Sequence, residues 1–361
     1  MQIDFSKPVM VTGASGYIAS WIVQQLLEAG VSVHATVRDP SRADSVAHLK
    51  AIAAGKPGNL TIFKADLLEP SSFDAAARDC SVVFHTASPF LIGKLRDPER
   101  QLLKPALEGT RNVLGTVERT PSIRRVVLTS SVASIYGDAA ELARAPGGVF
   151  TEAQWNETST LAHNPYPYSK VCAEREAWKL ASAQSRWDLV AINPGLVLGP
   201  SLTTRSQSYS IDLLTALGKG RYRTGVPDLW FGCVDVRDVA KAHLRAAFTP
   251  SAKGRYIVAG EEVSLLGIAR HIAAKYPARR LPRLCLPKAV VWLLGPISAG
   301  ISRKFVSLNV GHPVRFDASR SVRELGVSYR PVAETVQEQY AQLIHDRVIS
   351  PASGHSAGTA R

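Results

Sequence analysis

Short apolar runs alternate with amphipathic helical patterns along the first 195 residues. The apolar runs are rich in β-branched residues, as buried strands are, and they occupy 9–12, 31–37, 60–66, 81–87, 124–131 and 187–193. The helical patterns between them cover 17–29, 42–54, 71–79, 99–119 and 166–184. Strands that alternate with helices in this way predict parallel βαβ units, and therefore an α/β fold with a doubly wound parallel sheet.

The pattern becomes mixed after residue 195. A strand and a helix at about 230–250 are expected to return to the sheet, so we predict a first domain made of 1–195 and about 230–250. The remainder, about 196–229 and 251–345, predicts a smaller mixed C-terminal lobe. The last residues (SPASGHSAGTAR) are small and polar, so a disordered tail is expected over 346–361.

The composition is that of a soluble globular protein, with 45% hydrophobic and 20% charged residues. The four cysteines have no metal-ligand or CxxC spacing, so we expect no metal site and a reducing, cytoplasmic location. The start of the chain has no signal-peptide pattern. The nearest candidate for a membrane span, 284–301, is interrupted by Pro287, Lys288, Gly295 and Pro296.

The net charge of +13 is concentrated near the C-terminus, where 253–361 hold 16 Lys and Arg against 7 Asp and Glu. Because these bases are scattered and no aromatic residues are interleaved with them, nucleic acid is not expected as a partner. A solvated surface and a polyanionic cofactor explain the charge better. The apolar run AVVWLLGPISAGI (289–301) predicts a buried helix, and contact with a membrane surface is the less favoured alternative.

A glycine-rich turn follows the first predicted strand. In GASGYIA (13–19), Gly13 permits a tight turn, Gly16 lets backbone N–H groups approach a pyrophosphate, and Ala19 allows close packing of helix on strand. The N-terminus of the following helix adds partial positive charge. The turn therefore predicts a dinucleotide site.

The ends of the next two strands indicate which dinucleotide binds. An NAD site usually carries an acidic residue after the second strand, whereas a 2′-phosphate needs an arginine. Arg38 stands there, with Arg42 four residues later, and this favours NADP(H) although Asp39 follows directly. Asp66, at the end of the third strand, is expected to meet the adenine amino group, unless it is an ordinary turn residue.

Tyr166 and Lys170 form a Tyr-x-x-x-Lys pair at the start of a predicted helix, where positions i and i+4 share one face. A phenol is a poor acid at neutral pH unless a cation lowers its pKa, and Lys170 is expected to do so. Ser131 ends the strand at 124–131, on the edge where doubly wound sheets bind ligands. It is a candidate donor to a substrate carbonyl, or else a cap.

With these residues in place, the chain resembles the extended short-chain dehydrogenases/reductases over nearly its full length. Within them it is most similar to the dihydroflavonol/cinnamoyl-CoA reductase branch and to the microbial carbonyl (aldehyde/methylglyoxal-type) reductases. The matching segments are VTGASGYIASW (11–21), ATVRDP (35–40), VFHTASPF (83–90), RVVLTSS (125–131), YPYSK (166–170), AINPGLVLGP (191–200) and VDVRDVAKAH (234–243).

The resemblance implies a Rossmann-type NADP-binding domain, a substrate-binding C-terminal lobe and the catalytic residues Ser131, Tyr166 and Lys170. It places the substrate against Phe90 and Tyr136. The cofactor-binding residues that it implies are Gly13, Ser15, Gly16, Tyr17, Ile18, Arg38, Asp66, Leu67, Thr86, Ala87, Ser88, Pro194 and Val197.

The implied reaction is the NADPH-dependent reduction of an aldehyde or ketone by a monomer or homodimer, with Tyr166 as general acid. A nucleotide-sugar epimerase, a hydroxysteroid-type dehydrogenase and a non-catalytic NADP-sensing protein are the alternatives. TSSVASIY (129–136) departs from the TSSAGTVN of plant flavonoid reductases, which argues against a dihydroflavonol. HNPYPYSK (163–170) lacks the NWYCY-type motif of cinnamoyl-CoA reductases, which argues against a CoA thioester.

Overall fold

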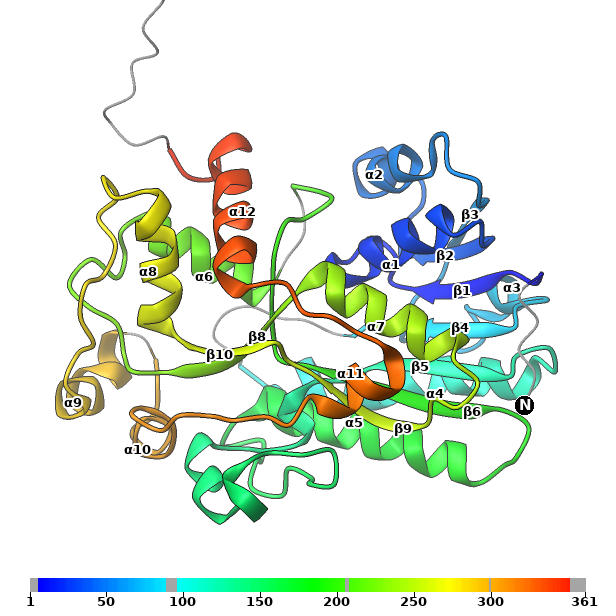
Figure 1. The fold of residues 1–361 in the computed structure, drawn as a ribbon. Coiled ribbons are helices and arrows are strands. Elements are labelled where there is room, and N and C mark those ends of the chain that lie inside the picture. The colour runs from blue at the N-terminus through cyan, green and yellow to red at the C-terminus, as the bar shows by residue number, and fades with distance from the viewer. Residues whose placement is uncertain (1–5, 89–95, 205–207, 299, 351–361) are drawn as a thin grey trace, which may run out of the picture.

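A seven-stranded parallel sheet forms the centre of the molecule (Figure 1). The computed structural model describes residues 6–88, 96–204, 208–298 and 300–350. In the sheet order β3-β2-β1-β4-β5-β6-β9, the strands are Leu60–Lys64, Val33–Val37, Val9–Thr12, Val82–His85, Arg125–Thr129, Asp188–Pro194 and Gly254–Val258. The strand order reverses between β1 and β4, so the carboxyl ends of these strands flank the crevice in which doubly wound sheets bind ligands. The predicted fold class is confirmed.

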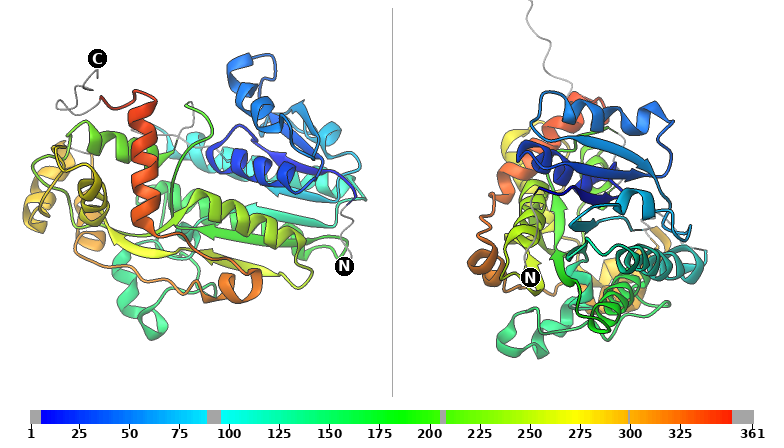
Figure 2. Two further views of the ribbon diagram at one scale, coloured as in Figure 1. Left: turned by 45° about the horizontal axis from the view of Figure 1, so that its top comes forward. Right: turned by 90° about the vertical axis from the view of Figure 1, so that its right-hand side faces the viewer.

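Helices cover both faces of this sheet, as the end-on view in Figure 2 shows. One face carries α1 (Tyr17–Glu28), α2 (Ala43–Ala53), α7 (Val236–Phe248) and α11 (Ser319–Leu325). The other carries α3 (Asp74–Ala77), α4 (Lys104–Arg119) and α5 (Pro165–Ser182). A short π-helical turn, η1 (Glu99–Leu103), precedes α4. Each face buries its own apolar cluster, which is why the strands read as continuous apolar runs.

A second, three-stranded sheet organises the smaller lobe. Its order is β10-β8-β7, with strands Glu261–Ser264, Trp230–Asp235 and Leu196–Leu198. The helices α6 (Tyr209–Gly218), α8 (Leu265–Lys275) and α12 (Val332–His345) pack with it around one apolar cluster. Beyond them lie α9 (Lys288–Ser298) and α10 (Arg303–Asn309). Between β5 and α5 the chain forms the short 3₁₀ turns η2 (Val132–Ser134), η3 (Ala139–Arg144) and η4 (Pro146–Gly148).

Two strand assignments near the lobe boundary were wrong. The strand at 230–235, expected in the large sheet, pairs instead with β7 and β10, and only the helix that follows it, α7, packs on the large sheet. The strand at 254–258, expected in the smaller lobe, pairs with β6 as the edge of the large sheet. Both runs are short and apolar, so the sequence pattern does not distinguish which sheet receives them.

Two further expectations about the C-terminal third also fail. The helix at 288–298 is not buried, because Val291 and Gly295 alone lie in the interior among 288–297, the residues whose burial is described. The predicted disordered tail begins too early: Ile349 is 1% exposed and packs in the cluster of the smaller lobe. Residues 351–361, the rest of the predicted tail, lie outside the described residues.

Candidate active site

A cavity of about 640 Å³ runs along the carboxyl ends of β1, β2, β3 and β4, and we call it the cofactor groove. Nine of the residues predicted to bind cofactor line it. They are Gly13, Ser15, Gly16, Arg38, Asp66, Leu67, Thr86, Ala87 and Ser88. These residues come from four separate segments of the chain, each of which follows one of the strands β1 to β4. The sheet topology brings the segments together at one edge, as expected for a dinucleotide site.

The glycine turn at the base of the groove fits a pyrophosphate. Gly13 has φ +63°, and a Cβ atom there would stand 3.1 Å from the Cα atom of Ala87. A Cβ on Gly16 would stand 3.1 Å from the Gly13 carbonyl oxygen. No side chain caps the N-terminus of α1 and its first turn holds no acidic residue. This end of the helix therefore presents backbone N–H groups and partial positive charge to an anion.

The other end of the groove is basic. Arg38 and Arg42 follow β2, are exposed and line the cavity, and within the described part of the chain Arg38 forms no ion pair. Asp39 does not compete with them, because its carboxylate accepts the Ser41 N–H at 3.0 Å and the Ser41 hydroxyl at 2.6 Å. These two bonds lower the pKa of Asp39. The donor set suits a 2′-phosphate rather than a free 2′-hydroxyl.

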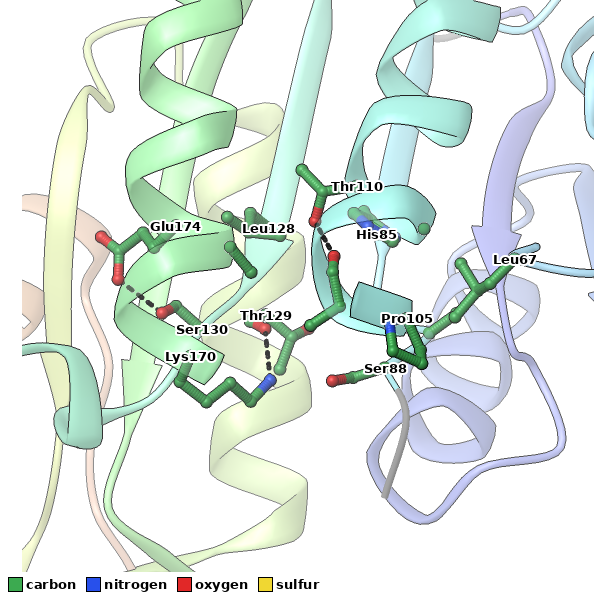
Figure 3. Close-up of a pocket in the computed structure, with 14 residues that line it drawn as sticks. Leu67, His85, Ser88, Pro105, Thr110, Leu128, Thr129, Ser130, Lys170 and Glu174 are labelled. Atoms are coloured by element: carbon green, nitrogen blue, oxygen red, sulfur yellow. Dashed lines mark hydrogen bonds between the residues drawn. The ribbon is translucent and has the colours of Figure 1, made fainter. Parts of the chain in front are cut away.

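A small inner pocket adjoins the groove and shares Leu67, Ala87, Ser88 and Pro105 with it. Its cavity of about 20 Å³ is enough for roughly one water molecule. Lys170 of α5 reaches this pocket, and its ammonium donates to the Thr129 carbonyl oxygen at 3.4 Å (Figure 3). The predicted lysine is therefore positioned at the end of β5, beside the cofactor groove.

Tyr166 lies one helical turn before Lys170, in the first turn of α5, and is half-buried. Burial raises the pKa of Tyr166 to about 12. That Lys170 lowers this pKa stays a prediction. A phenol with this pKa stays protonated at neutral pH, which suits a group that donates a proton.

Ser131 is the second residue after β5 and caps the 3₁₀ turn η2, where its Oγ accepts the Ala133 N–H at 3.1 Å. The capping role considered from sequence is therefore real. It uses a lone pair of the hydroxyl and leaves the O–H as a donor. Ser131 and Tyr166 line neither the groove nor the inner pocket.

Burial also shapes the charge of the lysine and its neighbours. Desolvation lowers the pKa of Lys170 to about 8, and the nearby Glu174 carboxylate opposes this shift. His85, which lines the inner pocket, has its pKa lowered to about 3 by burial and by Lys170. His243 accepts a hydrogen bond from the Thr129 hydroxyl at Nε2, 2.7 Å away, and desolvation lowers its pKa to about 4. Both histidines are expected to be neutral at pH 7, so Lys170 is the cation among the described residues that line the inner pocket.

A buried network holds the strands and helix that carry these groups. Glu174, one turn after Lys170, pairs with Arg255 of β9 at 2.6 Å and accepts from the Ser130 hydroxyl and from Asn193 at 2.9 Å. Asn193 also donates to the Ser131 carbonyl oxygen at 3.1 Å. One carboxylate thus connects β5, β6, β9 and α5.

The remaining predicted residues lie elsewhere. The Tyr17 hydroxyl donates to the Gly199 carbonyl oxygen at 2.6 Å, a buried contact within the protein. Tyr136 stacks on Phe150 with ring centroids 4.6 Å apart. Ile18, Pro194 and Val197 line neither cavity. Phe90 lies outside the described residues.

The structure adds residues to the site that were not predicted. Ser45 and His48 of α2 line the groove, as do Gln101, Pro105 and Thr203. Both ring nitrogens of His48 are buried and have no hydrogen-bond partner among the described residues, and desolvation lowers its pKa. His48 and Glu174 read in the sequence as ordinary helix positions, and only the i+4 spacing of Glu174 from Lys170 could have indicated its role.

A parallel sheet with a glycine turn after β1 and a Tyr-x-x-x-Lys helix beside the groove defines a dinucleotide-binding oxidoreductase of the extended short-chain dehydrogenase/reductase type. The chain belongs to the NAD dependent epimerase/dehydratase family, whose model matches residues 9–260. Residues 6–350 with the gaps given above contain no helix that could span a membrane. The same segments show no cluster of metal-ligating side chains.

Known reductases are similar to this chain over most of its length. Cinnamoyl-CoA reductase CAD2 from Medicago truncatula is 35% identical over 94% of this chain and 96% of its own. Anthocyanidin reductase from Arabidopsis thaliana is 35% identical over 75% and 81%. The structure of yeast methylglyoxal/isovaleraldehyde reductase Gre2 complexed with NADPH superposes with a TM-score of 0.77 at 27% identity, covering 94% of this chain and 99% of that one.

Proposed function

We propose that the chain reduces an aldehyde or ketone to an alcohol with NADPH. The observation that carries the proposal is the continuity of the two cavities. The groove with Arg38 and Arg42 at one end adjoins, through Ala87 and Ser88, the inner pocket that Lys170 enters. The two arginines expected at a 2′-phosphate and the lysine of the Tyr-x-x-x-Lys pair thereby lie along one edge of the sheet. The reductases reported above support this assignment.

When bound, NADPH supplies the hydride, and the residues of this chain orient the substrate and handle the proton. The Ser131 O–H donates to the carbonyl oxygen and fixes its direction. The Tyr166 phenol, kept protonated by burial, gives its proton to that oxygen as negative charge develops on it. The Lys170 ammonium, held against the Thr129 carbonyl at 3.4 Å, stabilises the phenolate that remains.

The alternatives fit these residues less well. An epimerase that holds NAD needs an acidic group at the end of β2, but Asp39 is tied to Ser41 and Arg38 faces the groove. A sensing protein has no need of both Tyr166 and Lys170. We propose a cytoplasmic enzyme, active as a monomer or homodimer, whose substrate is a small carbonyl compound.

The test is NADPH oxidation, followed by absorbance, across aldehydes, diketones and aryl ketones, with NADH as the competing cofactor. Turnover that requires NADPH and is lost in Tyr166→Phe supports the proposal. Tight NADPH binding without turnover of any carbonyl would overturn it in favour of a sensor. A cofactor that survives purification and is NAD would favour an epimerase.

A further inference from the structure

The surface of α9 is apolar and faces solvent. Of the nine large hydrophobic side chains that are exposed in the described part of the chain, five lie in this helix. Ile297 is 87% exposed, Leu293 57% and Trp292 41%. Leu284, just before the helix, adds a sixth. Scattered exposed apolar residues are normal, but a cluster in one helix marks a binding surface.

Helical spacing explains how the cluster arises. Val291 and Gly295, one turn apart, face inward, and Val291 packs against Val306 of α10. Val290, Leu293 and Ile297 follow the i, i+3, i+7 spacing of one helix face, and that face points away from α10. We call Val290, Trp292, Leu293, Leu294 and Ile297 the apolar face of α9.

The segment of the chain that carries this face has only positive charge. The sequence from 263 to 316 contains nine Lys and Arg and no Asp or Glu. The Arg303 guanidinium lies over the Trp292 ring, 4.5 Å from its centroid, and Lys304 is exposed beside it. Lys288, at the start of α9, is also exposed and donates to the Ser307 carbonyl oxygen at 2.9 Å. An apolar helix with a tryptophan and a basic rim has the chemistry of an interfacial anchor.

The position of α9 leaves the cofactor groove accessible. Figure 1 shows α9 and α10 at the end of the molecule opposite α2 and β3, and the left view of Figure 2 agrees. Arg38 and Arg42 follow β2 at that opposite end. A flat partner seated on α9 therefore does not cover the entrance to the groove.

We propose that the apolar face of α9 docks on an anionic lipid bilayer, with its axis in the plane of the surface. This replaces the sequence-based expectation of a buried helix without membrane contact. The helix is too short to span, so its apolar side chains enter only the interface while the basic rim meets the lipid headgroups. In a symmetric dimer through this face, two rims of like charge would meet, and the segment 263–316 that forms them supplies no acidic residue to neutralise them. Residues 350–361 are small and polar in sequence, so they are a poor cover for an apolar face.

The test is sedimentation of the full chain with lipid vesicles. We expect binding to vesicles of phosphatidylcholine mixed with phosphatidylglycerol, weaker binding at high salt, and little binding to phosphatidylcholine alone. Ile297→Asp should lower the partition coefficient more than tenfold, because it removes apolar burial and adds a repelled charge. Arg303→Gln with Lys304→Gln should lower it about 25-fold, at roughly fivefold for each base removed.

Two exposed positions of α11 supply matched controls. Val322→Asp and Arg323→Gln change an exposed apolar residue and an exposed base on another helix, and both should bind vesicles like the parent chain. Thermal melting and NADPH binding are measured for each variant to show whether the fold is intact. Equal binding to neutral and anionic vesicles, or no binding to either, would overturn the proposal. Light scattering that shows a dimer of the parent chain and a monomer of Ile297→Asp would instead assign the face to a second copy.

Discussion

The Glu174 carboxylate and the Arg255 guanidinium form a buried ion pair at 2.6 Å, between a helix and the last strand of the large sheet. The two residues are 81 positions apart, and both are buried, with Arg255 6% and Glu174 1% exposed. Arg255 also donates to the carbonyl oxygens of Glu152, at 3.0 Å, and of Gln154. The pair therefore fixes β9, the segment before α5 and α5 itself, one turn beyond Lys170.

Breaking this pair should destabilise the protein strongly. In Glu174→Gln the Arg255 charge stays buried without a counter-ion, which typically costs about 3–5 kcal/mol. Urea denaturation of the variant and the parent chain measures the loss. Glu28→Gln, which breaks the exposed pair with Lys56, is the control and should change the free energy of unfolding by less than about 1 kcal/mol. An equal effect in both variants would contradict the role given to the buried pair.

The rate of reduction should fall as the pH rises through about 8. Burial lowers the pKa of Lys170 to about 8, below its usual value, so the folded protein loses the ammonium in this range while Tyr166, with a pKa of about 12, keeps its proton. Lys170→Arg should move this alkaline limb to higher pH, because arginine stays charged. Glu174→Gln should move it to lower pH, since Glu174 raises the pKa of Lys170.

The measurement is a pH profile of kcat at saturating NADPH. Lys179→Gln removes an exposed lysine of the same helix and should leave the profile unchanged. An alkaline limb that is the same in Lys170→Arg and in the parent chain would show that another group titrates.

Tyr166→Phe should lower kcat by two to four orders of magnitude, roughly the contribution of a positioned general acid. The dissociation constant of NADPH should hardly change, because the phenol acts on the substrate oxygen. Tyr168→Phe is the matched control, since Tyr168 lies on the same helix two residues away and faces another side. Comparable losses in the two variants would mean that removal of either hydroxyl disturbs the helix rather than the chemistry.

Arg38→Ala should weaken NADPH binding by about 10- to 100-fold, as expected for loss of a charge-assisted hydrogen bond of roughly 1.5–3 kcal/mol. NADH binding should change much less, because it lacks the 2′-phosphate. Fluorescence titration of both cofactors measures the ratio, with the exposed Arg323→Ala as control. Equal weakening for NADH and NADPH would show that Arg38 does not recognise the phosphate.

Asn309→Ala should lower kcat by about tenfold to a hundredfold without a matching loss of NADPH affinity. Asn309 of α10 donates to Asp138 at 2.6 Å, and Asp138 bonds His163 at 2.7 Å and Asn164 at 3.0 Å, just before Tyr166. A small displacement of this start of α5 moves the phenol, and rates are sensitive to such shifts. Ser307→Ala, exposed on the same helix, should leave kcat unchanged. Proportional loss of kcat and NADPH affinity in Asn309→Ala would indicate general misfolding instead.

The sequence by itself determined the local features of the nucleotide-binding half. The hydrophobic periodicity that distinguishes a strand from a helix is contained within each segment. The glycine turn, the position of Arg38 and the Tyr-x-x-x-Lys spacing likewise depend only on neighbours in the chain. These features also placed nine predicted residues in one groove, because the carboxyl ends of parallel strands must meet at one edge of the sheet.

Only the tertiary structure decided which sheet received 230–235 and 254–258, which partner neutralised Arg255, and which face of 288–298 met solvent. Each depends on contacts between segments that are distant in sequence. The raised pKa of Tyr166 is of the same kind, because it comes from burial, which is set by the packing around α5 and not by spacing along the helix.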